Sequence, residues 1–130
     1  MTRADFEEAV RAARGWSAIA VSSARIFRPQ VAQFTARKGL YFALDLYGEL
    51  DYIGSASRAE DGGLADRVLK HTNARRSRWR SFYLLPLREE TPTPLVRDIE
   101  GDCIRRFIPP GNVIVPGIAW IPRYPGTAPT

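Results

Sequence analysis

The segment 39–54, GLYFALDLYGELDYIG, constrains the fold more than any other part of the chain. Apolar residues alternate with tyrosine and polar residues on both sides of Gly48-Glu49. A two-residue type II′ turn takes glycine at its first central position. We therefore expect a β-hairpin with strands at 39–47 and 50–56.

This turn would place Ala43 opposite Gly54, and successive residues of a strand point to opposite faces. One face is apolar and is expected to join the core: Leu40, Phe42, Leu44, Leu46 and Ile53. The other face carries Tyr41 and Tyr52, between which Ala43 and Gly54 would leave backbone that a substrate can approach. The alternative is two ordinary sheet tyrosines beside a strand-end glycine.

The remaining pattern predicts an α+β fold, with a small antiparallel sheet (a three-stranded core) flanked by helices. The third strand is expected at 81–87, and 16–22 is a further candidate. Helices are expected at 4–14, 64–74 and 93–108. For the last helix, Thr93 is the expected N-cap and Pro94 the first helical residue.

We expect the chain to be divided into three parts. They are an N-terminal extension (1–38), a central domain (39–112) and a C-terminal strand or tail (113–130). Composition favours a cytoplasmic protein with no membrane segment, because no apolar run approaches about 20 residues and the N-terminus lacks a signal-peptide centre. The single cysteine excludes an internal disulfide and cysteine-based metal sites.

The net charge of +5 is concentrated in one segment, NARRSRWRSF at 73–82. Guanidinium groups pair with phosphates, and aromatic rings stack on bases. The segment therefore predicts nucleic-acid contacts from Arg75, Arg76, Arg78, Trp79 and Arg80. The alternative is a solvated basic loop.

Two expected helices carry residues that their packing does not require. Arg67 and the only histidine, His71, are four residues apart and so share a helix face. Glu100 falls inside the apolar stripe of its helix, where an unpaired carboxylate is costly. It must therefore be paired, bind a metal or face a cleft, and a buried pair with Arg67 is the structural alternative.

Taken in order, these features resemble the GIY-YIG nuclease family. GLY at 39–41 and YIG at 52–54 match its two triplets, with leucine for isoleucine in the first. Their outer glycines, Gly39 and Gly54, would support the site. Short triplets are weak alone, but the later elements of the family also follow.

Arg67 matches an arginine on the family's next helix, and His71 a histidine four residues beyond it. Glu100 matches a single helical glutamate, and Asn112 the supporting asparagine that ends a proline-rich turn. The resemblance covers about 39–112. The loop before Arg67 is longer than usual in the compact members, so Arg58 is the alternative arginine.

The resemblance implies a metal-dependent endonuclease that hydrolyses DNA phosphodiester bonds, one strand per active site. Tyr41 would be the general base, with His71 as a relay because a free tyrosine has a pKa near ~10. Glu100 would hold one Mg²⁺ or Mn²⁺. Arg67 would stabilise the phosphate in the transition state, and Tyr52 would assist by hydrogen bonding.

Ser55 and Ser57 follow the second triplet and are expected to contact the DNA backbone. The aromatic, basic segment favours single-stranded or branched DNA. Two other functions stay open. One is a nucleic-acid-binding module on the same fold without catalysis, and the other is a protein-interaction domain. The sequence does not decide between monomer and dimer, nor the biological role.

Overall fold

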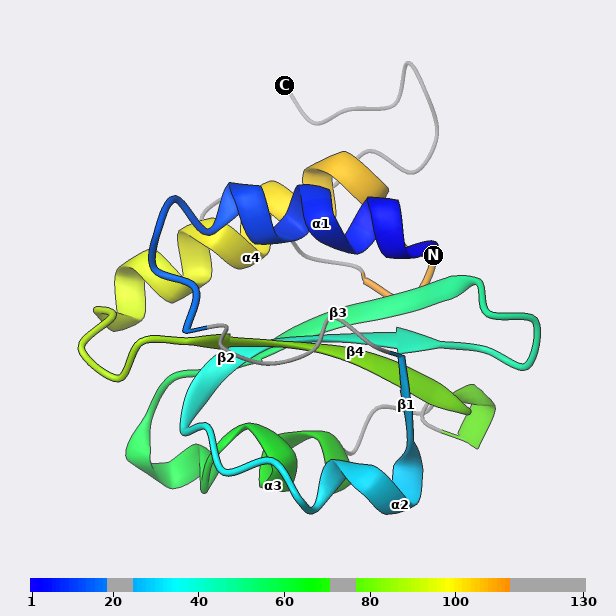
Figure 1. Cartoon of the computed structure of the whole chain (residues 1–130), viewed down its shortest axis with the longest axis horizontal. Helices are drawn as coiled ribbons and strands as arrows, with labels where there is room; N and C mark the ends of the chain where they lie inside the picture. The colour runs from blue at the N-terminus through cyan, green and yellow to red at the C-terminus, as the bar shows by residue number, and fades with distance from the viewer. Residues whose placement is uncertain (19–24, 71–76, 113–130) are drawn as a thin grey trace.

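The computed structural model describes residues 1–18, 25–70 and 77–112. Within these residues the chain forms three layers, with an antiparallel sheet between two pairs of helices (Figure 1). The strands are β1 (Ile26–Phe27), β2 (Lys38–Leu44), β3 (Leu50–Ala56) and β4 (Ser81–Leu87), in the order β1-β4-β2-β3. The helices are α1 (Arg3–Ala12), α2 (Arg28–Val31), α3 (Leu64–Leu69) and α4 (Thr93–Phe107), with a short 3₁₀ turn, η1 (Ala59–Asp61), before α3.

The expected α+β class is confirmed, but the described sheet has four strands instead of three. The added strand, β1, pairs with β4 over two residues only. A strand this short shows no alternation, which is why the sequence pattern did not reveal it. Of the candidate strand at 16–22, Ser17 forms an isolated bridge to Leu87, and 19–24 lie outside the described residues.

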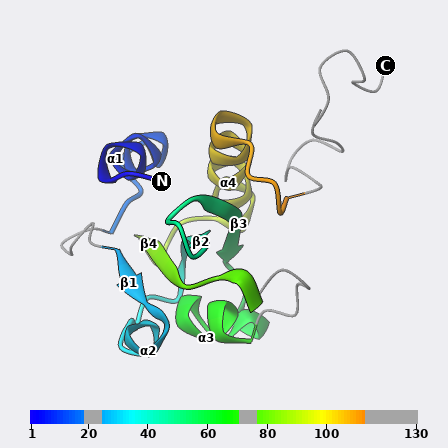
Figure 2. The same ribbon diagram turned by 90° about the vertical axis from the view of Figure 1, so that its right-hand side faces the viewer.

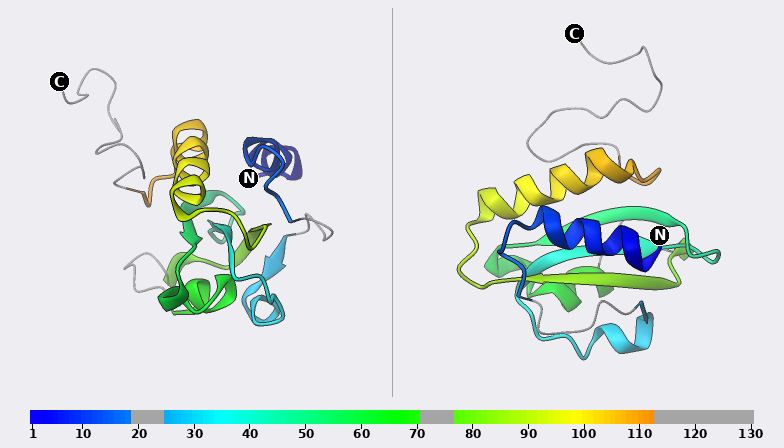
Figure 3. Two further views of the ribbon diagram at one scale, coloured as in Figure 1. Left: turned by 90° about the vertical axis from the view of Figure 1, so that its left-hand side faces the viewer. Right: turned by 45° about the horizontal axis from the view of Figure 1, so that its top comes forward.

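Helices cover both faces of the sheet (Figure 2). On one face, α1 and α4 lie side by side (Figure 3), joined by an ion pair of 3.0 Å between Arg106 and Glu8. Beneath α1, Phe6 stacks on Tyr83 with ring centroids 4.8 Å apart. On the other face, α2 and α3 cover a second core. The N-terminal helix thus packs into the same core as the central strands.

Strand β2 is buried on both faces because it lies between the two cores. Leu40 and Phe42 point into the core under α1 and α4. Tyr41 and Ala43 point into the core above α2 and α3. The face that was expected to be open to a substrate is therefore covered by helices.

The hairpin register differs from the expected one. Tyr41, and not Ala43, lies opposite Gly54. The cause is the side chain of Asp45, whose Oδ1 accepts hydrogen bonds from the N–H groups of Tyr47 and Glu49. This Asx-type interaction produces a longer loop in place of the two-residue turn.

The observed register differs from the expected one by an even number of residues, so most side chains still point to the face that was expected for them. The prediction is wrong only at the tip of the hairpin, where Leu46 was expected to be buried and is 69% exposed. Nearer the tip, the pairing shifts between Ala43 and Leu44, which leaves Asp51 as an extra residue on β3. A bulge of this kind re-aims a side chain, and here it turns Asp51 into the interior, where it is 4% exposed.

The ring of Tyr41 lies directly over Gly54 on the neighbouring strand. A Cβ at position 54 would come within 2.2 Å of Cζ and 2.3 Å of Oη of Tyr41. Glycine is therefore required here by packing, since it lets the aromatic ring cover the backbone of an edge strand.

The boundaries of α1 and α4 agree with expectation to within a few residues, with one difference in capping. Helix α4 begins at Thr93, but Pro92 is the N-cap, and no side chain caps the helix. The expected helix at 64–74 is seen as α3 up to Leu69, and 71–76 lie outside the described residues. In the part of the chain that the structure describes, no helix has the length and apolarity to cross a membrane.

Replacing Gly54 with alanine tests the contact with Tyr41. We expect Gly54→Ala to lower the free energy of unfolding by about 1–3 kcal/mol, because the buried ring must move from its place. Urea denaturation measures the loss. In a Tyr41→Leu background the same change should cost less, and an equal cost in both backgrounds would contradict the assigned contact.

Candidate active site

A polar cavity of about 210 Å³ lies at the open edge of β3. This strand has a neighbour, β2, on one side only, and both helix layers reach its other side. The cavity is lined by Tyr52, Gly54, Ser55, Ser57, Arg58, Asp61, Arg67, Arg97, Glu100 and Asn112. Residues from α3, α4, β3 and the loop after β3 therefore meet at one point.

Asn112 fastens the turn after α4 to the edge of β3. Its Oδ1 accepts a hydrogen bond from the N–H of Ile53, and its Nδ2 donates to the carbonyl oxygen of Ile53, both at 2.8 Å. The amide side chain thus pairs with Ile53 as a further strand would, and it is 4% exposed. This pairing fixes α4, and with it Glu100, against the strand.

Glu100 is the buried carboxylate of the cavity, 8% exposed. Burial raises the pKa of Glu100 from 4.5 to about 7, although a hydrogen bond from Ser55 and the charges of Arg97 and Arg67 act in the opposite direction. The Ser55 hydroxyl donates to Oε1. Near neutral pH the carboxyl group is therefore divided between its neutral and ionised forms.

Three arginines surround this carboxyl group, each from a different element. Arg58 comes from the loop after β3, Arg67 from α3 and Arg97 from α4, and all three are solvent-exposed. Arginine guanidinium groups bind phosphate and carboxylate oxygens with paired hydrogen bonds. A cavity lined by three of them is suited to an anionic ligand, and Arg58 is also paired with Glu60 at 3.4 Å and Asp61 at 3.9 Å.

Asp61 holds the loop that carries Ser57 and Arg58. Its Oδ2 accepts hydrogen bonds from the N–H groups of both residues, each at 2.9 Å. Burial alone would raise the pKa of Asp61, but these hydrogen bonds and the charges of Arg67 and Arg58 keep that pKa below its ordinary value. Asp61 is thus an ionised group that positions the loop.

The two triplet tyrosines occupy different places. Tyr52 lines the cavity, whereas Tyr41 is fully buried and lies over Gly54. Burial raises the pKa of both phenols; Tyr52 also raises the pKa of Tyr41, and Arg67 lowers both. Both phenols therefore carry their protons at neutral pH in this arrangement.

Trp79 lies in the interior, not on the surface where a nucleic acid could reach it. It is 1% exposed, stacks on Tyr52 with ring centroids 5.3 Å apart, and donates from Nε1 to Asp51 at 2.9 Å. The expectation that Trp79 stacks on a base is therefore corrected. Its basic neighbours gave it the appearance of a surface residue, but the bulge at Asp51 supplies a buried acceptor for its indole.

The structure brings seven of the fifteen expected site residues together in this cavity. Those that line the cavity are Tyr52, Gly54, Ser55, Ser57, Arg67, Glu100 and Asn112. Gly39 is elsewhere, packed so that a Cβ would lie 2.5 Å from the Leu85 carbonyl oxygen. Arg78 and Arg80 are exposed. His71, Arg75 and Arg76 lie outside the described residues.

Two residues of the cavity were not expected from the sequence. Arg97 precedes Glu100 by three positions, and this spacing places the two side chains on neighbouring parts of one helix face. The sequence therefore contained an indication that Arg97 lies near Glu100. Asp61 had no comparable signal, because its role depends on the loop conformation. Arg58 was the alternative to Arg67, and both line the cavity.

The cavity fits one hard divalent cation held by Glu100. Mg²⁺ keeps several waters and is commonly bound through one or two carboxylates together with substrate phosphates. Glu100 is the buried carboxylate of the cavity and would be the protein ligand of such a cation. A cation bound there would lower the pKa of Glu100 and so counteract the effect of burial on that pKa.

Comparison with protein-family models, with curated proteins and with solved structures finds no match to this chain. The function must therefore be argued from the geometry and chemistry of the cavity.

The raised pKa of Glu100 predicts a pH-dependent stability difference between the wild type and Glu100→Gln. Between pH 4.5 and 7 the folded carboxyl group holds a proton that the unfolded one has released, so wild-type stability falls as pH rises. Glutamine does not titrate. The variant should therefore gain up to about 3 kcal/mol over the wild type from pH 4.5 to 7, and no more above.

Urea denaturation of both proteins between pH 4 and 9 measures this difference. Ser55→Ala serves as the matched variant, because it removes the hydrogen bond that favours the ionised form and should move the change to higher pH. A difference that does not vary with pH would contradict the assigned environment of Glu100.

Proposed function

We propose that the chain is a metal-dependent endonuclease that hydrolyses DNA phosphodiester bonds, with GIY-YIG-like chemistry. The observation that carries this proposal is the convergence of Glu100, Arg67 and Tyr52 in one cavity. These residues come from α4, α3 and β3. The resemblance assigns roles to the same three residues.

Phosphodiester hydrolysis requires charge stabilisation on the phosphoryl oxygens and an oriented water. Arg67 would bind those oxygens, and Arg97 and Arg58 add positive charge on the other walls of the cavity. A divalent ion bound by Glu100 would supply further polarisation of the phosphate. The Ser55 hydroxyl would keep the carboxyl group of Glu100 in position.

The two tyrosines would act on the attacking water. Tyr52 faces the cavity and can hydrogen-bond there, while the hydroxyl end of Tyr41 lies beside Gly54, which forms part of the wall. A positive charge in the cavity would lower the pKa of both phenols by attraction. The base role of Tyr41 therefore depends on the charge that the loaded site acquires.

A second function has one observation in its favour. Tyr41 is fully buried, which suits a packing residue better than a general base. The cavity would then bind a phosphate without cleaving it, and the chain would be a nucleic-acid-binding module. Salt-sensitive binding of oligonucleotides without any cleavage is the result that this function predicts.

Cleavage of matched single-stranded, duplex and flapped DNA tests the proposed nuclease. We expect cleavage in Mg²⁺ or Mn²⁺ and none in EDTA. Glu100→Gln, which keeps the shape of the side chain, should slow the reaction about 100-fold or more because it loses the carboxylate. Glu7→Gln, at an exposed position of α1, is the control and should cleave as the wild type does.

The pH dependence gives a second measurement on the same proteins. The rate should rise with pH through about 7 at low metal concentration, because only ionised Glu100 binds the cation. Saturating metal should move this rise to lower pH. Cleavage that persists in Glu100→Gln or in EDTA would overturn the proposed chemistry.

A further inference from the structure

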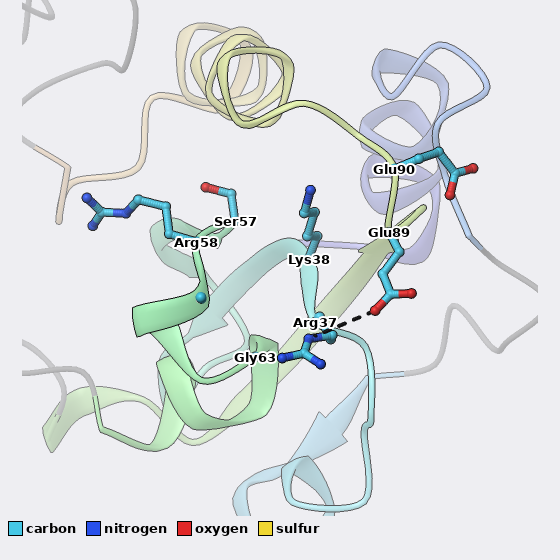
Figure 4. A pocket seen from close by; sticks show the side chains of 8 residues that line it. Arg37, Lys38, Ser57, Arg58, Gly63, Glu89 and Glu90 are labelled. Atoms are coloured by element: carbon cyan, nitrogen blue, oxygen red, sulfur yellow. Dashed lines mark ion pairs between the residues drawn. The ribbon is translucent and has the colours of Figure 1, made fainter.

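A second cavity, of about 600 Å³, adjoins the candidate active site. It shares Ser57 and Arg58 with that site. Figure 4 shows Lys38 between these two residues on one side and Glu89 and Glu90 on the other. We call this cavity the Lys38 groove; its remaining lining residues are Arg37, Ala59 and Gly63.

Lys38 is held in a defined position in the groove. It is the first residue of β2, it is partly buried, and its Nζ donates to the carbonyl oxygen of Thr91 at 2.7 Å. An ammonium group has three N–H donors, so the bond to Thr91 leaves donors for a ligand. A cation fixed in this way loses less conformational entropy on binding than a freely moving surface lysine.

The groove has one basic and one acidic side. Lys38 supplies positive charge on the side of Ser57, whereas the guanidinium group of Arg58 points away from Lys38 in Figure 4 and pairs with Glu60 at 3.4 Å and Asp61 at 3.9 Å. On the opposite side Glu89 lies 3.9 Å from Arg37, and Glu90 is exposed. Carboxylates repel a phosphate and accept hydrogen bonds from base amino groups, so this asymmetry would direct a phosphate towards Lys38 and Ser57.

We propose that the Lys38 groove binds a phosphate of the nucleic-acid strand adjacent to the one in the candidate active site. The strand would pass from Glu100 and Arg67 across Ser57 and Arg58 to Lys38. The assignment of the occupant as DNA rests on the proposed function. The groove's position and charge are independent of whether the first cavity cleaves.

Binding of a fluorescent single-stranded oligonucleotide of roughly 12 nucleotides, in EDTA, tests the groove without requiring catalysis. Lys38→Met keeps the aliphatic stem and removes the charge. It should weaken binding about three- to tenfold and reduce the slope of log affinity against log salt by about 0.7, the value for one lost phosphate contact. Arg3→Met, on α1, is the matched control and should change neither quantity.

The outcomes separate this inference from the proposed nuclease. Weaker binding and a smaller slope in Lys38→Met support the groove even if no protein cleaves DNA. Cleavage by the wild type with unchanged binding and slope in a folded Lys38→Met protein would overturn the groove alone. Absence of oligonucleotide binding, or displacement of the oligonucleotide by equimolar inorganic phosphate, would overturn it as a strand-binding site.

Discussion

The burial of β2 on both faces is the constraint on which the rest of the structure depends. Helices α1 and α4 take one face of the sheet, and α2 and α3 take the other. Burial of each large apolar side chain contributes roughly 1.5–3 kcal/mol, so neither face can be left open at small cost. Polar chemistry is then confined to an edge of the sheet. The edge of β3 is suited to it because residues from both helix layers meet there around one strand.

At this edge two opposing effects act on Glu100. Desolvation favours the neutral acid, whereas Ser55, Arg97 and Arg67 favour the carboxylate, and the resulting pKa of about 7 shows that desolvation prevails in part. A purely structural ion pair would be expected to hold the carboxylate ionised well below neutral pH. A buried acid with a raised pKa beside arginines is an arrangement that also occurs at functional sites.

Periodicity predicted the parts of the molecule in which each residue interacts mainly along its own strand or helix. The strands expected at 50–56 and 81–87 and the burial of Glu100 within the stripe of α4 belong to this class. The strand expected at 39–47 is also present, but it ends at Leu44. The hairpin register was missed because a side chain, Asp45, decides it. The interior position of Trp79 was missed because its hydrogen-bond acceptor, Asp51, is turned inward by a bulge that the alternating pattern does not show.

The triplet residues and the cavity residues carry different weight as indications of function. Gly54 is required because the ring of Tyr41 covers it, and Gly39 because Leu64 and Leu85 pack on it. These residues would be selected for packing even in a protein without catalysis. Glu100 and the exposed arginines have no such packing requirement: apolar residues in the α4 stripe would avoid the cost of desolvation. The proposed chemistry on phosphodiesters therefore depends on the carboxyl group and the arginines beside it, together with Tyr52, more than on the glycines and Tyr41.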